Sequence, residues 1–95
     1  IVSGGENINP MEIEEKLIKI DGILDSAVVG EDNEEWGQQV IAFVVFESHE
    51  LSESVIKNEL KKTLSRFKIP KKIINVPLIP RNELGKIVYG KLNDL

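Results

Sequence analysis

The sequence predicts an α+β domain: a small central sheet of about three main strands plus a short N-terminal strand, covered by two helices and followed by a short C-terminal helix. Three observations predict this fold. Two capped amphipathic segments alternate with apolar runs in the order helix, strand, strand, helix, strand. Residues 40–46 are apolar without interruption, which indicates a strand buried on both faces and central in the sheet. Ninety-five residues are enough for a single domain, residues 1–95, and too few for two.

The first helix is predicted to begin after Asn9. Asn9 is a favourable N-cap, Pro10 suits the first helical position, and Glu12 completes a capping box. The apolar residues at 13, 17 and 20 share one helix face, and the Asp-Gly pair at 21–22 predicts the end of the helix.

The remaining elements follow the same rules. Strands are predicted over 23–29 and 39–46, joined by an acidic segment over 30–37. Ser52 caps a second helix that ends near Arg66, ahead of the break at Pro70. A third strand over 72–76, an extended turn over 77–80 and a short helix over 88–95 complete the chain.

The composition limits the class of protein. A hydrophobic fraction of 41% with 29% charged residues is ordinary for a soluble globular domain, and no apolar run reaches the roughly 18 residues of a membrane span. The chain opens Ile-Val-Ser with neither a basic start nor an initiator Met, so we expect a fragment of a longer protein without a signal peptide. The absence of cysteine excludes disulfides and favours the cytoplasm.

Charge is distributed unevenly along the chain. Residues 1–50 hold twelve acidic residues and two lysines, whereas residues 51–95 hold four acidic and ten basic residues. Two interpretations are open: solvated helix faces, or a basic half that meets a phosphate-bearing ligand. Nucleic acid is disfavoured, because the chain is acidic overall and its five aromatic residues form no stacking series.

Several chemistries are excluded by the residues present. A Walker A loop fails at both ends, since Pro80 and Ile87 stand where it needs Gly and Ser or Thr. His49, the only histidine, lies in a polar loop and is predicted to be a solvated turn residue. Zinc ligands are lacking, and the acids at 31–32 and 34–35 have no calcium-loop spacing, so no metal site is predicted. Nothing here predicts a self-contained active site.

Two segments nevertheless carry a pattern. Ser-Gly-Gly-Glu-Asn-Ile-Asn-Pro-Met-Glu-Ile-Glu occupies 3–14 and Pro-Arg-Asn-Glu-Leu-Gly-Lys-Ile occupies 80–87, with Trp-Gly at 36–37 and Phe-Lys-Ile-Pro-Lys at 67–71 between them. Each is weak alone, but the ordered set is unusual. Over nearly its whole length the chain resembles the C-terminal domain of adenylate-forming enzymes, the superfamily of acyl- and aryl-CoA synthetases, peptide-synthetase adenylation domains and firefly luciferase. The first segment is most typical of the acyl-CoA ligases.

The resemblance implies a lid on a larger N-terminal domain that binds ATP and a carboxylic acid. In the first half-reaction of the family, the carboxylate attacks the α-phosphate of Mg-ATP to give an acyl-adenylate and pyrophosphate. The lid then rotates, and the thiol of coenzyme A converts the adenylate into a thioester and AMP. The resemblance also implies that the hinge precedes Ile1, that ATP (with Mg) and coenzyme A are bound mainly by the N-terminal domain, and that the isolated domain is inactive.

It further implies roles for single residues. Lys86 matches the catalytic lysine, a point charge on a long stem that a flexible Gly85 turn would deliver between two anions. Gly5, with its neighbour Glu6, matches the loop that lines the pantetheine tunnel. The alternatives are an exposed turn lysine for Lys86 and a positive-φ turn for Gly5.

Three more positions match coenzyme A contacts. Trp36 and Phe67 fall where aryl-CoA ligases place aromatic residues near pantetheine and adenine, with core packing as the alternative for each. Lys71 falls on a basic position that meets the phosphates of coenzyme A, with a solvated lysine as the alternative. Two positions depart from the pattern: residue 69 is Ile where some aryl-CoA ligases have Arg, and Asn82 replaces the usual Thr, although Asn can also order a turn.

The sequence therefore predicts the lid domain of an acyl-CoA synthetase, whose partners are its own N-terminal domain, a small carboxylic acid and coenzyme A. Two alternatives stay open: an adenylation domain that loads a carrier protein, and a non-enzymatic α+β module that binds a phosphorylated ligand or RNA. A phosphate-binding loop upstream would favour the enzyme. The acid itself is not encoded here, because its pocket would lie on the N-terminal domain.

Overall fold

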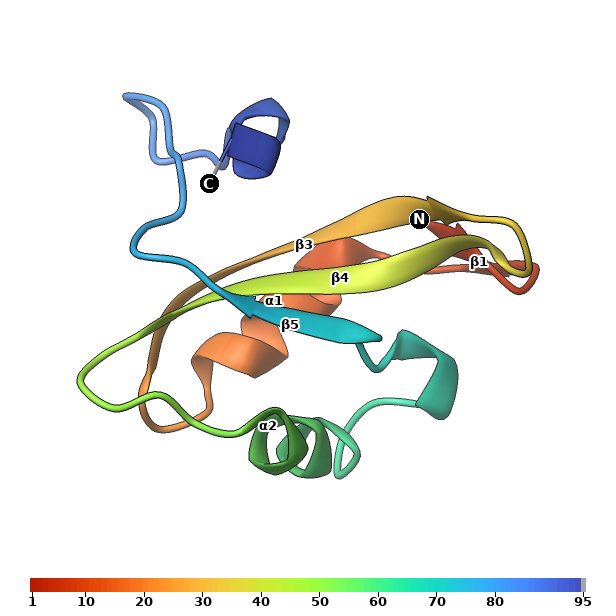
Figure 1. Ribbon diagram of the computed structural model, residues 1–95, viewed down its shortest axis with the longest axis horizontal. Helices are drawn as coiled ribbons and strands as arrows, with labels where there is room; N and C mark the ends of the chain where they lie inside the picture. The colour runs from red at the N-terminus through yellow and green to blue at the C-terminus, as the bar shows by residue number, and fades with distance from the viewer. Residues whose placement is uncertain (95) are drawn as a thin grey trace.

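The computed structural model describes residues 1–94 and confirms the α+β class. Two helices cover one face of a five-stranded sheet (Figure 1). In chain order the elements are β1 (Val2–Ser3), β2 (Glu6–Asn7), α1 (Pro10–Ile18), β3 (Ile23–Asn33), β4 (Gly37–Phe46), α2 (Glu53–Leu60), the 3-10 helix η1 (Arg66–Lys68), β5 (Lys72–Asn75) and the 3-10 helix η2 (Tyr89–Asp94).

Strand β4 is the centre of the sheet, as the sequence predicted. Strand β3 runs antiparallel along one edge of β4, with Ala27 opposite Phe43. On the other edge β5 runs parallel, with Ala42 opposite Ile73, after a crossover through α2 and η1. Ser3 of β1 pairs with Gly37, the first residue of β4, and the other edge of β1 pairs with β2.

The two predicted N-caps are confirmed. The side chain of Asn9 accepts from the N–H of Met11 at 3.0 Å, and the hydroxyl of Ser52 accepts from the N–H of Val55 at 3.2 Å. The prediction that Glu12 completes a capping box, by accepting from the backbone N–H of Asn9, was wrong. The carboxylate of Glu12 instead accepts from the ammonium of Lys68 at 2.9 Å, and an opposite charge is a stronger partner than a backbone N–H.

Helix α2 is shorter than predicted, since it ends at Leu60 rather than near Arg66. Hydrogen bonds from the N–H of Lys62 to Glu59 and from Thr63 to Leu60 tighten the chain into turns there. The tightening keeps Leu64 in the core beside α2.

Strand β3 is longer than predicted, since residues 30–33 pair with β4 instead of forming a loop. The acidic side chains misled the prediction because they lie on an exposed stretch of strand, where Glu31 accepts from Gln39 at 3.1 Å. The connection that remains is short, and the side chain of Asn33 closes it by accepting from the N–H groups of Glu35 and Trp36. The C-terminal helix is a 3-10 helix, and Leu95 lies outside the described residues.

Two cores lie on opposite faces of β4, which confirms that this strand is buried on both sides. Toward the helices, Leu17 and Ile56 pack with the even-numbered residues of β4. Toward the other face, Ile41 and Phe43 pack against the segment that follows β5, through residues such as Leu92. Leu17 is fully buried, and truncating such a side chain to Ala costs about 2–5 kcal/mol.

This layering separates two sets of loops. The segment after β5 covers the face opposite the helices, and its turn over 81–87 lies at one end of the molecule (Figure 1). The β1–β2 and β3–β4 turns lie at the other end of the long axis, which measures 35 Å. Of the helices in residues 1–94, none is long and apolar enough to cross a membrane.

Candidate functional site

Lys86 lies on a tight turn whose shape is fixed by hydrogen bonds. The N–H of Asn82 donates to the carbonyl of Lys86, and the N–H of Gly85 donates to the carbonyl of Asn82, both at 2.9 Å. The Asn82 side chain accepts from the N–H groups of Leu84 and Lys86 at 2.9 and 3.0 Å. Gly85 has φ +80°, which suits glycine. Asn82 thus orders the turn, as expected.

The side chain of Lys86 lines a groove of about 450 Å³ between α1, β3 and the C-terminal segment. Lys86 is exposed, and its ammonium forms no ion pair with any carboxylate of residues 1–94. The groove combines charged groups with exposed apolar side chains, and its lining is Met11, Glu14, Glu15, Ile18, Asp25, Ser26, Arg81, Lys86, Ile87 and Tyr89. The lysine can therefore offer its charge to an anion that approaches from outside the chain.

Gly5 lies at the opposite end, in the turn between β1 and β2. Gly4 and Gly5 have φ +58° and +83°, so the predicted positive-φ turn is present. A Cβ added to Gly5 would meet no atom within 4 Å, so the turn is open to solvent. The N–H of Gly4 donates to the carbonyl of Trp36 at 2.9 Å, which joins this turn to the β3–β4 turn. Glu6 is exposed on β2 beside it.

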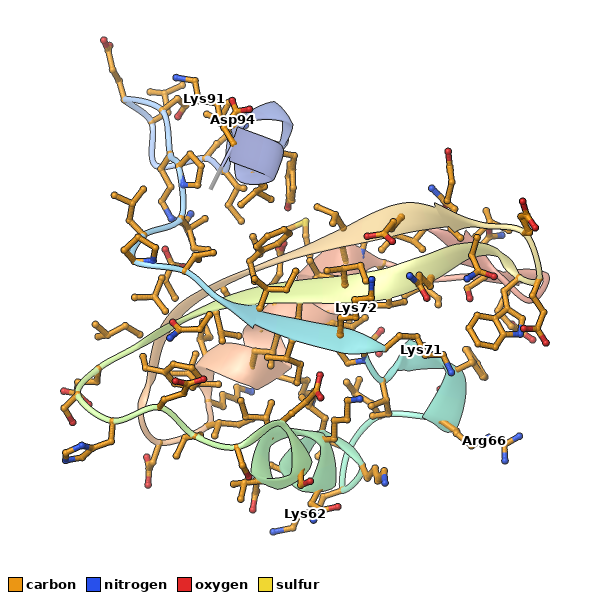
Figure 2. The ribbon with its side chains drawn as sticks, viewed as in Figure 1. Lys62, Arg66, Lys71, Lys72, Lys91 and Asp94 are labelled. Atoms are coloured by element: carbon orange, nitrogen blue, oxygen red, sulfur yellow. The ribbon has the colours of Figure 1, made fainter. Side chains whose placement is uncertain are left out.

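Trp36 and Lys71 are in direct contact. The ammonium of Lys71 lies 4.4 Å from the centroid of the indole, a cation–π distance. The backbone N–H of Lys71 donates to Val40 at 2.8 Å, which fixes the residue at the start of β5. Figure 2 shows Lys71 at the same end of the molecule as Arg66. Trp36 is half-buried under this lysine and not within the core, so core packing does not explain it.

Phe67 lies on η1 with 43% of its surface exposed, so core packing does not explain this residue either. Ile69, two residues later, is buried among the helices and β4. The hydrophobic residue at position 69 therefore contributes to folding here, while Phe67 is exposed to solvent. The structure thus brings Gly5, Glu6, Trp36 and Lys71 together at one end, and the turn over 81–87 that carries Lys86 lies at the other.

The charge asymmetry of the sequence is partly explained by pairing between the two halves. Lys68 binds Glu12, Lys72 approaches Glu31 at 3.7 Å, and Arg81 binds Asp25. These three pairs form within the domain. They are therefore neither fully solvated charges nor charges that meet an external phosphate-bearing ligand. Arg66 forms no ion pair with an acidic residue of the described chain, and Figure 2 shows it pointing outward.

The groove beside Lys86 also holds a carboxylate with two internal partners. Glu14 of α1 accepts from the backbone N–H of Val28 at 2.8 Å and from the hydroxyl of Tyr89 at 2.9 Å. Partial burial and this hydrogen bond raise the pKa of Tyr89 to about 12. Sequence reasoning missed four residues of this groove: Glu14, Asp25, Arg81 and Tyr89. Glu14 and Arg81 lie in the two motifs but had no role assigned to them, and Asp25 and Tyr89 lie in neither motif.

We expect the single tyrosine of this 95-residue chain to ionise with a midpoint pH of about 12 in the folded state, against about 10 in urea. Because the folded pKa is raised, the stabilisation is complete below pH 10 and is lost as the pH rises through 12. Phenolate absorbance during an alkaline titration measures both midpoints. A native midpoint equal to that in urea would contradict the Tyr89–Glu14 hydrogen bond.

His49 is exposed in the loop after β4, as predicted. Within residues 1–94, no three His, Asp or Glu side chains are grouped so as to hold a metal ion.

Comparisons with known proteins agree with this picture. The family model of the AMP-binding enzyme C-terminal domain matches residues 12–86. A long-chain-fatty-acid–CoA ligase of Mycobacterium tuberculosis is 44% identical over 94 residues, which cover 99% of this chain and 19% of that protein. A 2-succinylbenzoate–CoA ligase of Oceanobacillus iheyensis is 49% identical over 92 residues, or 97% of this chain and 19% of that protein.

Solved structures give the same result. The o-succinylbenzoate CoA synthetase of Bacillus subtilis in complex with its acyl-adenylate intermediate matches with a TM-score of 0.93 at 31% identity, over 99% of this chain and 19% of that one. The chain spans about a fifth of the length of these relatives. The expected resemblance is thereby confirmed: this chain belongs to the family of AMP-binding enzyme C-terminal domains.

Proposed function

We propose that this chain is the C-terminal lid domain of an ATP-dependent acyl-CoA synthetase. Its partner is the N-terminal domain of the same enzyme, which supplies the pockets for ATP and the carboxylic acid. The substrates are a small carboxylic acid, ATP with magnesium, and coenzyme A. The proposal includes a cytoplasmic location, which accords with a chain that contains no cysteine.

Lys86 is the catalytic residue of the first half-reaction. A carboxylate oxygen attacks the α-phosphorus, the new O–P bond forms, and pyrophosphate leaves. The reactants are both anions, so an ammonium placed between them lowers their repulsion and favours the developing charge. The charge of Lys86 suits this role, because it is exposed on an ordered turn and pairs with no carboxylate of residues 1–94.

The other end of the domain serves the second half-reaction. Coenzyme A sulfur attacks the acyl carbon of the adenylate, and AMP leaves. The open turn at Gly5 lets the thin pantetheine chain pass close to the backbone, with Glu6 beside it. Trp36, Phe67 and Lys71 offer aromatic and cationic surface to the nucleotide part of coenzyme A.

One observation carries the proposal: the turn over 81–87, which holds Lys86, and the β1–β2 turn, which holds Gly5, lie at opposite ends of the domain (Figure 1). A single docked orientation cannot place both at one reacting carbon. Two half-reactions with the lid in two orientations use both ends in turn. In support, two solved structures of the Bacillus subtilis o-succinylbenzoate CoA synthetase hold the acyl-adenylate intermediate in one case and, in a double mutant, a product analogue in the other.

The test uses the full-length protein with a panel of carboxylic acids. We expect pyrophosphate release that depends on both acid and ATP, and thioester formation with free coenzyme A. Thioester formation only on a carrier-protein pantetheine would assign the alternative function of carrier loading. No acid-dependent pyrophosphate release with any acid of the panel would favour the non-enzymatic module.

A further inference from the structure

The tip of the Lys86 turn is weakly tied to the rest of the molecule by its own backbone. Ile79 and Ile87 anchor the base of the turn in the second core. The hydrogen bonds of the tip link residues within 80–88 to one another, and Leu84 at the tip is 82% exposed. These contacts fix the shape of the turn but leave its position over the sheet to be set by something else.

The guanidinium of Arg81 provides that link, because all three of its nitrogens donate. Nε donates to Oδ2 of Asp25 at 3.0 Å, and Nη2 pairs with Oδ1 of the same carboxylate. Nη1 donates to the carbonyl of Gly85 at 2.7 Å. Asp25 is itself held in place, since its Oδ1 also accepts from the N–H of Ser26 at 2.9 Å. Strand β3 is thus connected through two side chains to the peptide group directly before Lys86.

We propose that Asp25 and Arg81 are positioning residues for adenylation, which hold the carbonyl of Gly85, and with it the backbone of Lys86, at one place relative to the sheet. The proposal rests on the adenylating role proposed above for Lys86. A long, flexible side chain delivers its charge reproducibly only when its starting point is fixed. A displacement of about 1 Å at a reacting centre can cost about 10²-fold in rate.

The exposure of the pair separates this role from a purely structural one. The side chains of Arg81 and Asp25 are 38% and 28% exposed, and an ion pair so accessible to water contributes little to folding stability. The hydrogen bond to Asp25 raises the pKa of Arg81 above its ordinary value, so the guanidinium stays charged at any working pH. Loss of the pair should therefore affect the rate far more than the stability.

Arg81→Lys and Asp25→Asn in the full-length enzyme test the proposal. Lysine keeps the charge but cannot make the three contacts of a guanidinium. We expect each variant to slow acid-dependent pyrophosphate release by about 10–10²-fold, chiefly in kcat, with the KM for ATP within about twofold. The rate of thioester formation from preformed acyl-adenylate should not change. The melting temperature should stay within about 2 °C of the wild-type value. The double variant should be no slower than the slower single variant, because both break one contact.

Two controls complete the experiment. Glu59→Gln removes an exposed ion pair with Lys62 on α2 and should adenylate at the wild-type rate. Arg81→Lys and Lys86→Ala are compared as separate single variants. If Arg81→Lys adenylates at the wild-type rate while Lys86→Ala is slow, the positioning role is overturned and the proposed function is left intact. Equal slowing of both half-reactions, or a large loss of melting temperature, would assign the pair to the fold instead. Wild-type adenylation by Lys86→Ala would refute the role of Lys86 itself, and the positioning role with it.

Discussion

Replacing Lys86 with Ala in the full-length enzyme is expected to slow acyl-adenylate formation by about 10²–10³-fold, the usual effect of removing one preorganised electrostatic group. Pyrophosphate release on mixing acid with ATP measures this step. Thioester formation from synthetic acyl-adenylate should be nearly unaffected, because the proposed second orientation presents the Gly5 end and not Lys86. Stability should hardly change, since Lys86 is exposed on a polar turn.

Two further variants sharpen this experiment. Lys86→Arg should restore little activity, since a wide planar guanidinium cannot occupy the space of one ammonium. Lys91→Ala removes another exposed lysine of the C-terminal segment and should leave adenylation at the wild-type rate. An enzyme with Lys86→Ala that adenylates normally would make Lys86 a surface residue without a catalytic role.

Gly5→Leu should have the complementary effect, with thioester formation slowed on the order of 10–10²-fold and adenylation spared. The lid alone leaves the space around Gly5 empty, so any clash must arise with the pantetheine chain or the partner domain. The measurement again compares pyrophosphate release with thioester yield from preformed acyl-adenylate.

Gly5→Ala is the matched control for backbone strain. Both substitutions place a Cβ at φ +83°, but only leucine adds bulk. Near-normal thioester formation by the alanine variant would show that space is what matters. Equal impairment of both half-reactions by Gly5→Leu would instead show that the glycine serves only the turn.

Local signals in the sequence predicted the fold well where they act over a few residues. The caps at Asn9 and Ser52 are confirmed, and so is the burial of β4 on both faces. Predictions failed where a distant partner decides the outcome. The carboxylate of Glu12 forms an ion pair with Lys68 instead of a hydrogen bond with the backbone at the start of its own helix. Residues 30–33 are part of a strand because they pair with β4.

The candidate site divides in the same way. Lys86 and Gly5 lie in short motifs and could be found from the sequence. The contact of Trp36 with Lys71 and that of Asp25 with Arg81 join residues far apart in the chain. No local pattern marks Asp25, because its partner Arg81 lies 56 residues away in the chain.

The placement of the aromatic residues gives the domain its own optical markers. Its single indole lies under Lys71 beside the Gly4–Gly5 turn, and its single phenol lies in the groove of Lys86. The two proposed half-reaction regions therefore carry chromophores of distinct kinds. On the roles proposed above, we expect indole emission from this chain to report on thioester formation and phenol absorbance to report on adenylation, with no dye attached.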